Sequence, residues 1–290
     1  MEDYAAKVKE QVERLQSRSY GEIEAAVAQK RITWWQREGA RFKTAQAPTP
    51  RQAFERLFLD YMHLSLEDLP ILHESEDEIA WLSKNPCPTL DACIELGRDP
   101  RQVCRAAYEK STQAFVSQLD PQLRFLRSYE EIRPYAPHCL ERIVRVDFVQ
   151  MMKVAIEEAK RSRQEGNKGY GAVVAFGNQI LAQAHDTAAT AADPSLHAEV
   201  NALREAARVR GEANLSGAIL VSTCEPCPMC SSLAVWANVT SIVYGASIEE
   251  TARLGKARIR VGAKEIVEKS PVMVEVIEGV LRSECLDLYR

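Results

Sequence analysis

The chain has 290 residues, of which 46% are apolar and 27% charged, and its net charge at pH 7 is −4. These proportions are typical of a folded protein and argue against a disordered chain or a strongly basic nucleic-acid-binding protein. The length exceeds the about 100–200 residues of one domain, so we expect two domains. Because there is no apolar run of about 20 residues and no signal-peptide core, we expect a cytoplasmic protein.

The first half of the chain shows the apolar spacing of helices. Spacings of three and four predict helices over 2–17 and 20–38, and Pro50 is a suitable first-turn residue for a third helix. Another long helix is expected over 101–119. Because β-branched alternation is almost absent, we predict a mainly helical domain of unknown role, with an irregular stretch over 85–90.

The second half alternates short apolar strands with amphipathic helices. The expected helices span 146–163, 196–208, 227–237 and 280–288, and the expected strands span 170–176, 179–185, 218–222, 241–244 and 272–277. Strands that alternate with helices indicate an α/β fold with helices on the faces of a sheet. We therefore expect a helical domain over residues 1–145 and an α/β domain over residues 146–290.

Two short motifs in the second half carry metal-ligating side chains. They are His197-Ala198-Glu199 and Cys224-Glu225-Pro226-Cys227-Pro228-Met229-Cys230, and each is expected at a strand-to-helix junction. Zinc binds imidazole nitrogen and thiolate sulfur, and three protein ligands leave a fourth position open for water, as in catalytic sites. A helix N-terminus also favours thiolates. The motifs therefore predict a zinc ion held by His197, Cys227 and Cys230.

Glu199 is the predicted catalytic residue because it follows His197 by two positions and can lie beside the metal without binding it. Zinc lowers the pKa of a bound water to about 7, and a nearby carboxylate can take its proton and return protons to a ring nitrogen and a departing amine. A His-x-Glu with a Pro-Cys-x-x-Cys is a known signature of zinc deaminases. The predicted reaction converts an amino-substituted nitrogen heterocycle to a carbonyl compound and ammonia.

These cysteines also fit other roles. A Cys-x-x-Cys alone also fits a redox pair or two core thiols. Cys224 forms a second Cys-x-x-Cys with Cys227 and can complete a structural zinc site with four protein ligands. We favour a non-ligand thiol at Cys224, at the end of a strand, because a four-ligand site would leave Glu199 without a role.

The segments around these motifs resemble the cytidine/deoxycytidylate deaminase superfamily, in particular bacterial guanine deaminases and tRNA adenosine deaminases. The resembling segments are 171–174, 193–203, 222–230 and 243–246, and the N-terminal half is not included. The resemblance implies the same three zinc ligands and Glu199 as the proton shuttle. It also implies a three-layer helix–sheet–helix domain with a five-stranded mixed sheet, and usually a homodimer.

Five further residues are predicted to bind the substrate. Trp236 can stack on a purine-sized ring, although a core tryptophan is about as consistent with its place on a helix. Asp186 stands where these relatives have a pocket asparagine, and an aspartate only accepts hydrogen bonds, so it favours a ring that offers N–H or positive charge unless it points to solvent. Tyr170 either adds a hydroxyl near the pocket or packs. Ala198 and Pro226 are expected beside the metal ligands.

The remaining cysteines of the first half, Cys87, Cys93, Cys104 and Cys139, have spacings that fit no standard zinc or iron–sulfur motif. We expect core thiols.

Three functions fit these observations. The first is a deaminase of a small heterocycle such as a guanine-like purine, a pterin, a pyrimidine or a triazine. The second is a tRNA-editing adenosine deaminase, which must hold a polyanion. Net acidity argues against it, and the basic residues between 253 and 260 are expected on a solvated helix face. The third is a deaminase-like module that senses a ligand, and the presence of Glu199 argues against it.

Overall fold

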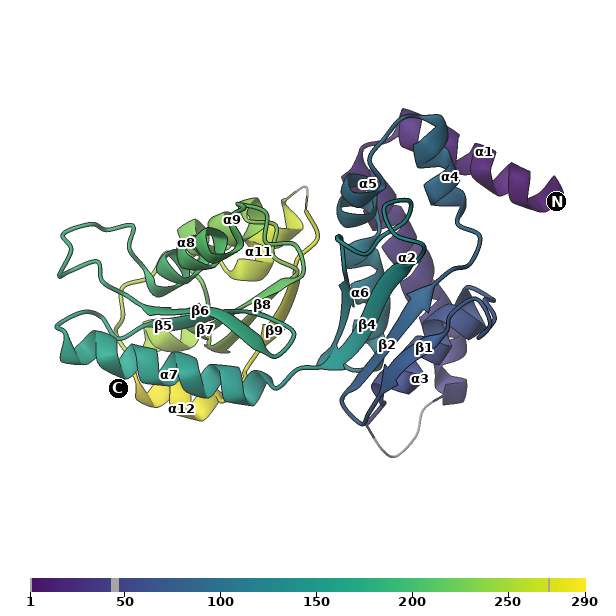
Figure 1. Cartoon of the computed structure of the whole chain (residues 1–290). Helices are drawn as coiled ribbons and strands as arrows, with labels where there is room; N and C mark the ends of the chain where they lie inside the picture. Colours follow the sequence, from purple (N-terminus) through teal and green to yellow (C-terminus); the bar gives the residue numbers. More distant parts are fainter. Residues whose placement is uncertain (1, 43–46, 271) are drawn as a thin grey trace. The chain divides into compact units, whose positions relative to one another are not determined.

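The computed structural model describes residues 2–42, 47–270 and 272–290. The chain divides into two compact units, Met1–Val146 and Asp147–Arg290, and each unit has its own hydrophobic core. Figure 1 shows the elements of both units. Within the described residues, no helix is long and apolar enough to span a membrane.

The helices of the first unit begin largely where the sequence predicts. Helices α1 (Glu2–Ser17) and α2 (Tyr20–Glu38) have the predicted bounds, and Ser19 caps α2 by accepting the backbone N–H of Glu22. Helix α3 (Pro50–Phe54) starts at the predicted proline and continues as the π-helix η2 (Glu55–Tyr61).

The single helix predicted over 101–119 is wrong, because the structure has two helices there. These are α5 (Pro100–Ala107) and α6 (Glu109–Leu119), separated by Tyr108, whose backbone lies outside the helical region at φ −136° and ψ −22°. A further helix, α4 (Pro88–Glu95), starts inside the stretch that was expected to be irregular.

The first unit also contains a four-stranded antiparallel sheet that the sequence analysis missed. The strands are β1 (Ile71–Glu74), β2 (Glu78–Ser83), β3 (Leu123–Arg127) and β4 (Cys139–Arg145), in the order β1-β2-β4-β3. Helices still make up most of the regular structure of this unit. The strands gave no clear alternation because polar residues are buried in them, including Arg124 at 2% exposure and Glu141 at 3%.

One face of this sheet packs against helices. Its core contains Phe54 and Leu57 from the α3–η2 segment, Trp81 from β2, Phe115 from α6 and Ile143 from β4. A smaller cluster joins α1, α2, α4 and α5. The unit is therefore a layer of helices on an antiparallel sheet, extended by a helical subcluster.

The second unit is built on the predicted five-stranded mixed sheet. Its strands are β5 (Gly171–Phe176), β6 (Gln179–His185), β7 (Ala218–Cys224), β8 (Ser241–Ala246) and β9 (Glu275–Glu278), in the order β6-β5-β7-β8-β9. Strands β7, β8 and β9 run parallel, whereas β5 is antiparallel to both of its neighbours. Every residue of β7 and β8 is buried, which explains their continuous apolar sequences.

Helices cover both faces of this sheet, as predicted for a three-layer domain. Figure 1 shows α7 (Phe148–Gln164) and α12 (Arg282–Asp287) on one face, and α8 (Ala198–Arg210), α9 (Pro228–Trp236) and α11 (Ala263–Glu268) on the other. The short helix α10 (Ile248–Arg253) follows β8 and, like α11, was not predicted.

Two glycines let helices of one face approach the sheet closely. A Cβ on Gly171 of β5 would lie 1.9 Å from the carbonyl oxygen of Ala155 in α7. A Cβ on Gly245 of β8 would lie 2.2 Å from the sulfur of Cys285 in α12. The layer of α7 and α12 therefore depends on both glycines, while the opposite layer carries the candidate site.

Candidate metal centre and its surroundings

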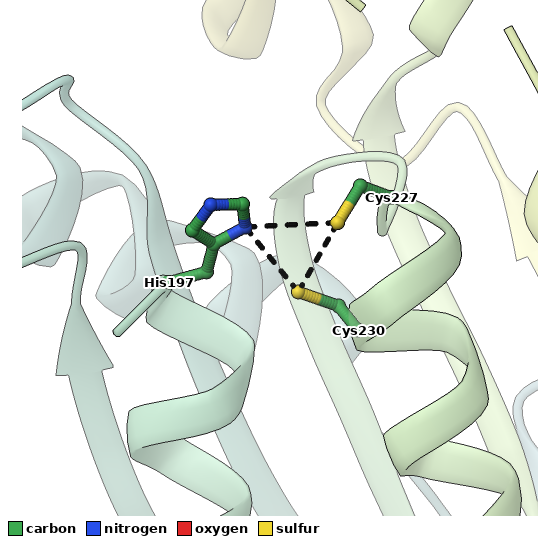
Figure 2. A group of neighbouring side chains, drawn as sticks. All are labelled: His197, Cys227 and Cys230. Atoms are coloured by element: carbon green, nitrogen blue, oxygen red, sulfur yellow. Dashed lines mark hydrogen bonds between the residues drawn. The ribbon is translucent and has the colours of Figure 1, made fainter. Parts of the chain in front are cut away.

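Three of the predicted site residues lie at the starts of two neighbouring helices. His197 directly precedes α8 with an extended backbone, φ −70° and ψ 159°, and Cys227 occupies the same position before α9, with φ −63° and ψ 168°. Cys230 lies in the first turn of α9. Figure 2 shows that these three side chains point toward one another. Neither His197 nor Cys227 caps its helix with its own side chain.

The three donor atoms form a triangle of the right size for one zinc ion. The Nδ1 of His197 lies 3.6 Å from the Sγ of Cys227 and 3.5 Å from the Sγ of Cys230, and the two sulfurs are 3.6 Å apart. Tetrahedral zinc with Zn–N and Zn–S bonds of about 2.1 and 2.3 Å separates N from S by about 3.6 Å and S from S by about 3.8 Å. The donors fit the ion, and among the described residues this is the one group of its kind.

The two sulfurs differ in their affinity for a proton. The hydrogen bond with Cys230, followed by that with His197, lowers the pKa of Cys227 to about 4. The neighbouring Cys227 sulfur and burial raise the pKa of Cys230. The pair therefore holds one proton tightly. A dication bound at the three donors favours the release of that proton, because zinc binds thiolates.

Glu199 lies in the first turn of α8 and is 6% exposed. Its Oε1 accepts a hydrogen bond of 3.1 Å from the Oγ of Ser222, and its Oε2 lies 3.6 Å from the Sγ of Cys230. Burial raises the pKa of this carboxyl. The structure thus places a carboxylate with increased proton affinity next to the three donors but outside their triangle.

The loop between β6 and α8 brings Asp186 to the same region. Asp186 is completely buried, its Oδ1 accepts the backbone N–H of Ala188, and its Oδ2 has no hydrogen-bond partner among the described residues. The hydrogen bond with Cys227 raises the pKa of the His197 imidazole most. The nearby Asp186 raises this pKa further, so the two residues lie close together. The alternative that Asp186 points to solvent is therefore wrong.

Asn201 of α8 holds this loop in place. Its Nδ2 donates to the carbonyl oxygen of His185 at 2.9 Å and to the Oγ1 of Thr187 at 3.1 Å. These two residues flank Asp186, so one amide group fixes the loop that carries both Asp186 and His197. The motif His-Ala-Glu did not reveal this role.

Cys224 lies apart from the three donors, at the end of β7, as expected for a non-ligand thiol. Its Sγ is 3.8 Å from the Oγ1 of Thr251 and 3.7 Å from an amino group of Arg258. Burial raises its pKa to about 12. The fourth-ligand alternative therefore has no support in the structure.

Arg258 was expected on a solvated helix face, and this expectation is wrong. It lies after α10 in an irregular segment, half-buried, and donates to the Oγ1 of Thr251 at 3.0 Å and to the hydroxyl of Tyr170 at 2.6 Å. The ring of Tyr170 packs on Tyr289 with centroids 5.2 Å apart. The ring of Tyr170 therefore packs and its hydroxyl accepts from Arg258, while its contact with substrate stays a prediction.

The role of Glu225, which lies between Cys224 and Cys227, was also missed. Its Oε2 accepts the backbone N–H of Ile248 at 2.9 Å and its Oε1 accepts that of Ala263 at 2.8 Å. These are the first residues of α10 and α11, whose free N–H groups favour a carboxylate. One side chain therefore ties the cysteine loop to the C-terminal segment.

The other predicted substrate contacts differ in exposure. Ala198 is completely buried, and Pro226 is buried with its carbonyl oxygen accepting from the Oγ of Ser231 at 2.9 Å. Trp236, at the end of α9, is 78% exposed. The alternative of a core tryptophan is wrong, and its contact with substrate stays a prediction.

The chain is similar to known deaminases over part of its length. The model of the cytidine and deoxycytidylate deaminase zinc-binding region matches residues 147–246. A tRNA-specific adenosine deaminase of Bacillus subtilis is 34% identical over 46% of this chain and 81% of its own. A guanine deaminase of the same species is 38% identical over 30% of this chain, which spans about half (55%) of that enzyme. A solved structure from studies of A-to-I editing by tRNA:A34 deaminases aligns at 24% identity over 48% of this chain and 98% of its own, with a TM-score of 0.43.

The fold and the zinc-binding motif define the class of the second unit, which is a hydrolytic deaminase of a nucleobase or nucleoside. The chain belongs to the cytidine and deoxycytidylate deaminase family. The family is a zinc-binding one, and the described His and Cys side chains provide a suitable donor set.

Proposed function

We propose that the second unit hydrolyses an exocyclic amino group of a small nitrogen heterocycle to a carbonyl and releases ammonia. In this proposal His197, Cys227 and Cys230 hold the zinc ion, which acts as a Lewis acid and makes water nucleophilic near neutral pH. Glu199 carries the protons, first from the attacking water and then to the ring nitrogen and the leaving amine. Its burial and its hydrogen bond from Ser222 support this role.

Asp186 is the observation that carries the substrate proposal. A buried carboxylate with one unpartnered oxygen is costly unless a ligand donates to it. The Oδ2 atom therefore favours a substrate that presents a ring N–H, an amino group or a protonated ring nitrogen at this edge. Guanine-like purines, pterins, isocytosine-type pyrimidines and aminotriazines all present such donors. Ala198, Pro226, Tyr170 and Trp236 are proposed as further substrate contacts.

The proposal is tested with zinc-loaded protein and a panel of free bases, pterins, aminotriazines, nucleosides and tRNA, with ammonia release as the readout. We expect release from one of the free heterocycles. The Asp186→Asn variant should shift the preference within the panel, because an amide both donates and accepts. An unchanged preference would show that Asp186 does not contact the ring, and release from tRNA alone would overturn the small-molecule substrate.

The similarity to tRNA-specific adenosine deaminase favours a second candidate, deamination of an adenosine in tRNA. An RNA substrate requires cationic surface near the site, and Arg253 and Arg260 are exposed in the segment that follows β8. Arg258 of the same segment is engaged with Tyr170 and does not add to this surface. Deamination of tRNA should weaken steeply as salt is raised from low to physiological concentration, whereas that of a neutral free base should not.

Assembly and cell location complete the proposal. The exposed Trp236 supports a homodimer in which a second copy covers the end of α9. All eight cysteines are free thiols, which supports a reducing cytoplasm.

A purely ligand-sensing role is less well supported, because binding alone needs no proton carrier at Glu199. We further propose that the units over residues 1–145 and 146–290 are separate domains, with catalysis confined to the second.

A further inference from the structure

The first unit contains buried arginines whose N–H groups lack acceptors. We call Arg31, Arg127 and Arg133 the arginine cluster. The Nε of Arg31, the Nη1 of Arg127 and the Nε of Arg133 are all buried without a hydrogen-bond partner among the described residues. Buried donors are nearly always paired in folded proteins, so three such atoms in one region need an explanation.

Arg31 of α2 is the member of the arginine cluster whose positive charge is least balanced by its neighbours. It is 8% exposed, and its Nη1 donates to the hydroxyls of Ser111 and Thr112 in α6, both at 2.9 Å. Within the part of the chain that the structure describes, no carboxylate forms an ion pair with it. Burial lowers its pKa to about 10. A buried charge that is held only by neutral hydroxyls is unfavourable unless an anion joins it.

Arg127 of β3 links the members of the cluster. Its Nε donates to the Oε1 of Glu141 at 2.8 Å, and its Nη2 donates to the same oxygen, so one edge of the guanidinium is paired. The Nη1, on the far side of the group, is the unpartnered atom. Arg127 and Glu141 lie close enough to Arg31 to affect its pKa, and Arg127 and Arg133 both affect that of Cys87.

Glu141 accepts from other groups, and among the described residues Arg31 makes no hydrogen bond to it. The Oε1 takes both donors of Arg127, and the Oε2 accepts the hydroxyl of Ser83 at 2.6 Å. The Arg127–Glu141 pair is neutral as a unit. The unpartnered N–H groups of Arg31, Arg127 and Arg133 favour an anion that supplies the acceptors.

Cysteine thiols lie beside the arginine cluster. The thiols of Cys87, Cys104 and Cys139 are half-buried next to Arg127 and each other. Burial raises the pKa of Cys104 to about 12, so this thiol stays neutral and does not compete with an anion. The Nε1 of Trp81 donates to Ser83 at 3.0 Å, and Ser83 in turn donates to Glu141 at 2.6 Å.

We propose that the arginine cluster binds a small organic carboxylate, with its charged end on Arg31 and Arg127 and its apolar part against the thiols. A carboxylate has the planar pair of acceptors that guanidinium groups bind. The thiols and the indole then cover a short hydrocarbon or aromatic group. The site lies wholly within the first unit and does not depend on the deaminase chemistry.

The test is isothermal titration calorimetry of the full-length, zinc-loaded protein with acetate, hexanoate, benzoate, inorganic phosphate and the neutral amide benzamide. We expect at least one carboxylate to bind with a dissociation constant below about 10 mM, and benzamide to bind much more weakly than benzoate. No binding of any carboxylate, or equal binding of benzoate and benzamide, would overturn the proposal. Tighter binding of phosphate than of every carboxylate would overturn the assigned ligand class.

Two variants separate a ligand site from a structural arginine. Arg31→Gln keeps a donor for Ser111 but removes the charge, so it should weaken carboxylate binding about thirtyfold or more. The ligand-free variant should unfold at the same or a higher temperature than the wild type, since an uncompensated buried charge is lost. Arg142→Gln, on the exposed side of β4 beside Glu78, is the matched control and should bind normally.

A lower unfolding temperature of ligand-free Arg31→Gln together with unchanged carboxylate affinity would show that Arg31 is structural and would contradict the proposal. If Arg31→Gln does not fold, Arg127→Lys is used instead. It keeps the charge near Glu141 but removes the planar group, and should also weaken binding.

Discussion

Glu225 gives the most specific test of how the metal centre is held. Its two oxygens accept the first N–H groups of α10 and α11, at 2.9 and 2.8 Å. In Glu225→Gln one of these N–H groups faces an amide NH2 instead of an acceptor. A hydrogen bond to a charged group contributes about 1.5–3 kcal/mol, so we expect a loss of about 2–3 kcal/mol in unfolding free energy.

This loss is measurable by differential scanning calorimetry of the zinc-loaded protein. For a unit of this size, 1 kcal/mol corresponds to about 3–4 °C, so the transition of the second unit should move down by about 6–12 °C. The control is Glu249→Gln, also at the start of α10, where the carboxylate meets Arg260 at 3.9 Å on the surface. That change should cost under about 1 kcal/mol.

The expected zinc content of Glu225→Gln is normal, because Glu225 is not among the three donors. If Glu225→Gln and Glu249→Gln unfold at the same temperature, the carboxylate does not clamp the two helices. The reasoning from the hydrogen bonds of Glu225 would then be refuted.

Three further predictions concern the second unit. Gly171→Ala should destabilise it by about 3 kcal/mol, measured by urea unfolding, because α7 must move off the sheet; an unchanged midpoint would contradict the close approach. Asn201→Asp should cost about 2 kcal/mol and slow turnover, because the donors that hold the β6–α8 loop are lost; wild-type values in both assays would exclude this role. His185 has a raised pKa because its hydrogen bonds to Glu158 and Glu165 outweigh burial. Its stabilisation is therefore complete below the unfolded pKa of about 6.5 and is lost as pH rises through the higher folded pKa, so His185→Gln should be most destabilising at acidic pH; a pH-independent difference would rule this out.

The features that sequence predicted well are those set by local spacing. The strand and helix periods of the second unit follow from its alternating apolar pattern, and the five-stranded sheet is confirmed. The three predicted metal ligands come together because each motif starts a helix over the same end of that sheet, where backbone geometry brings Nδ1 and both sulfurs within bonding range of one ion.

The features that sequence missed depend on contacts between distant segments. The sheet of the first unit contains Glu141, which is buried because Arg127 and Ser83 pair with it across neighbouring strands. A pattern of polar and apolar residues cannot show such a pair. Glu225 and Arg258 were missed for the same reason, since their partners lie on other elements and no local motif marks them.

Zinc content per chain, measured by elemental analysis of the purified wild type, Glu199→Ala and Cys227→Ala, tests the central claim most directly. The account predicts about one zinc ion in the wild type and in Glu199→Ala, and almost none in Cys227→Ala, because only the last removes a ligand. A wild type without zinc, or a Cys227→Ala variant that keeps it, would contradict the proposed centre.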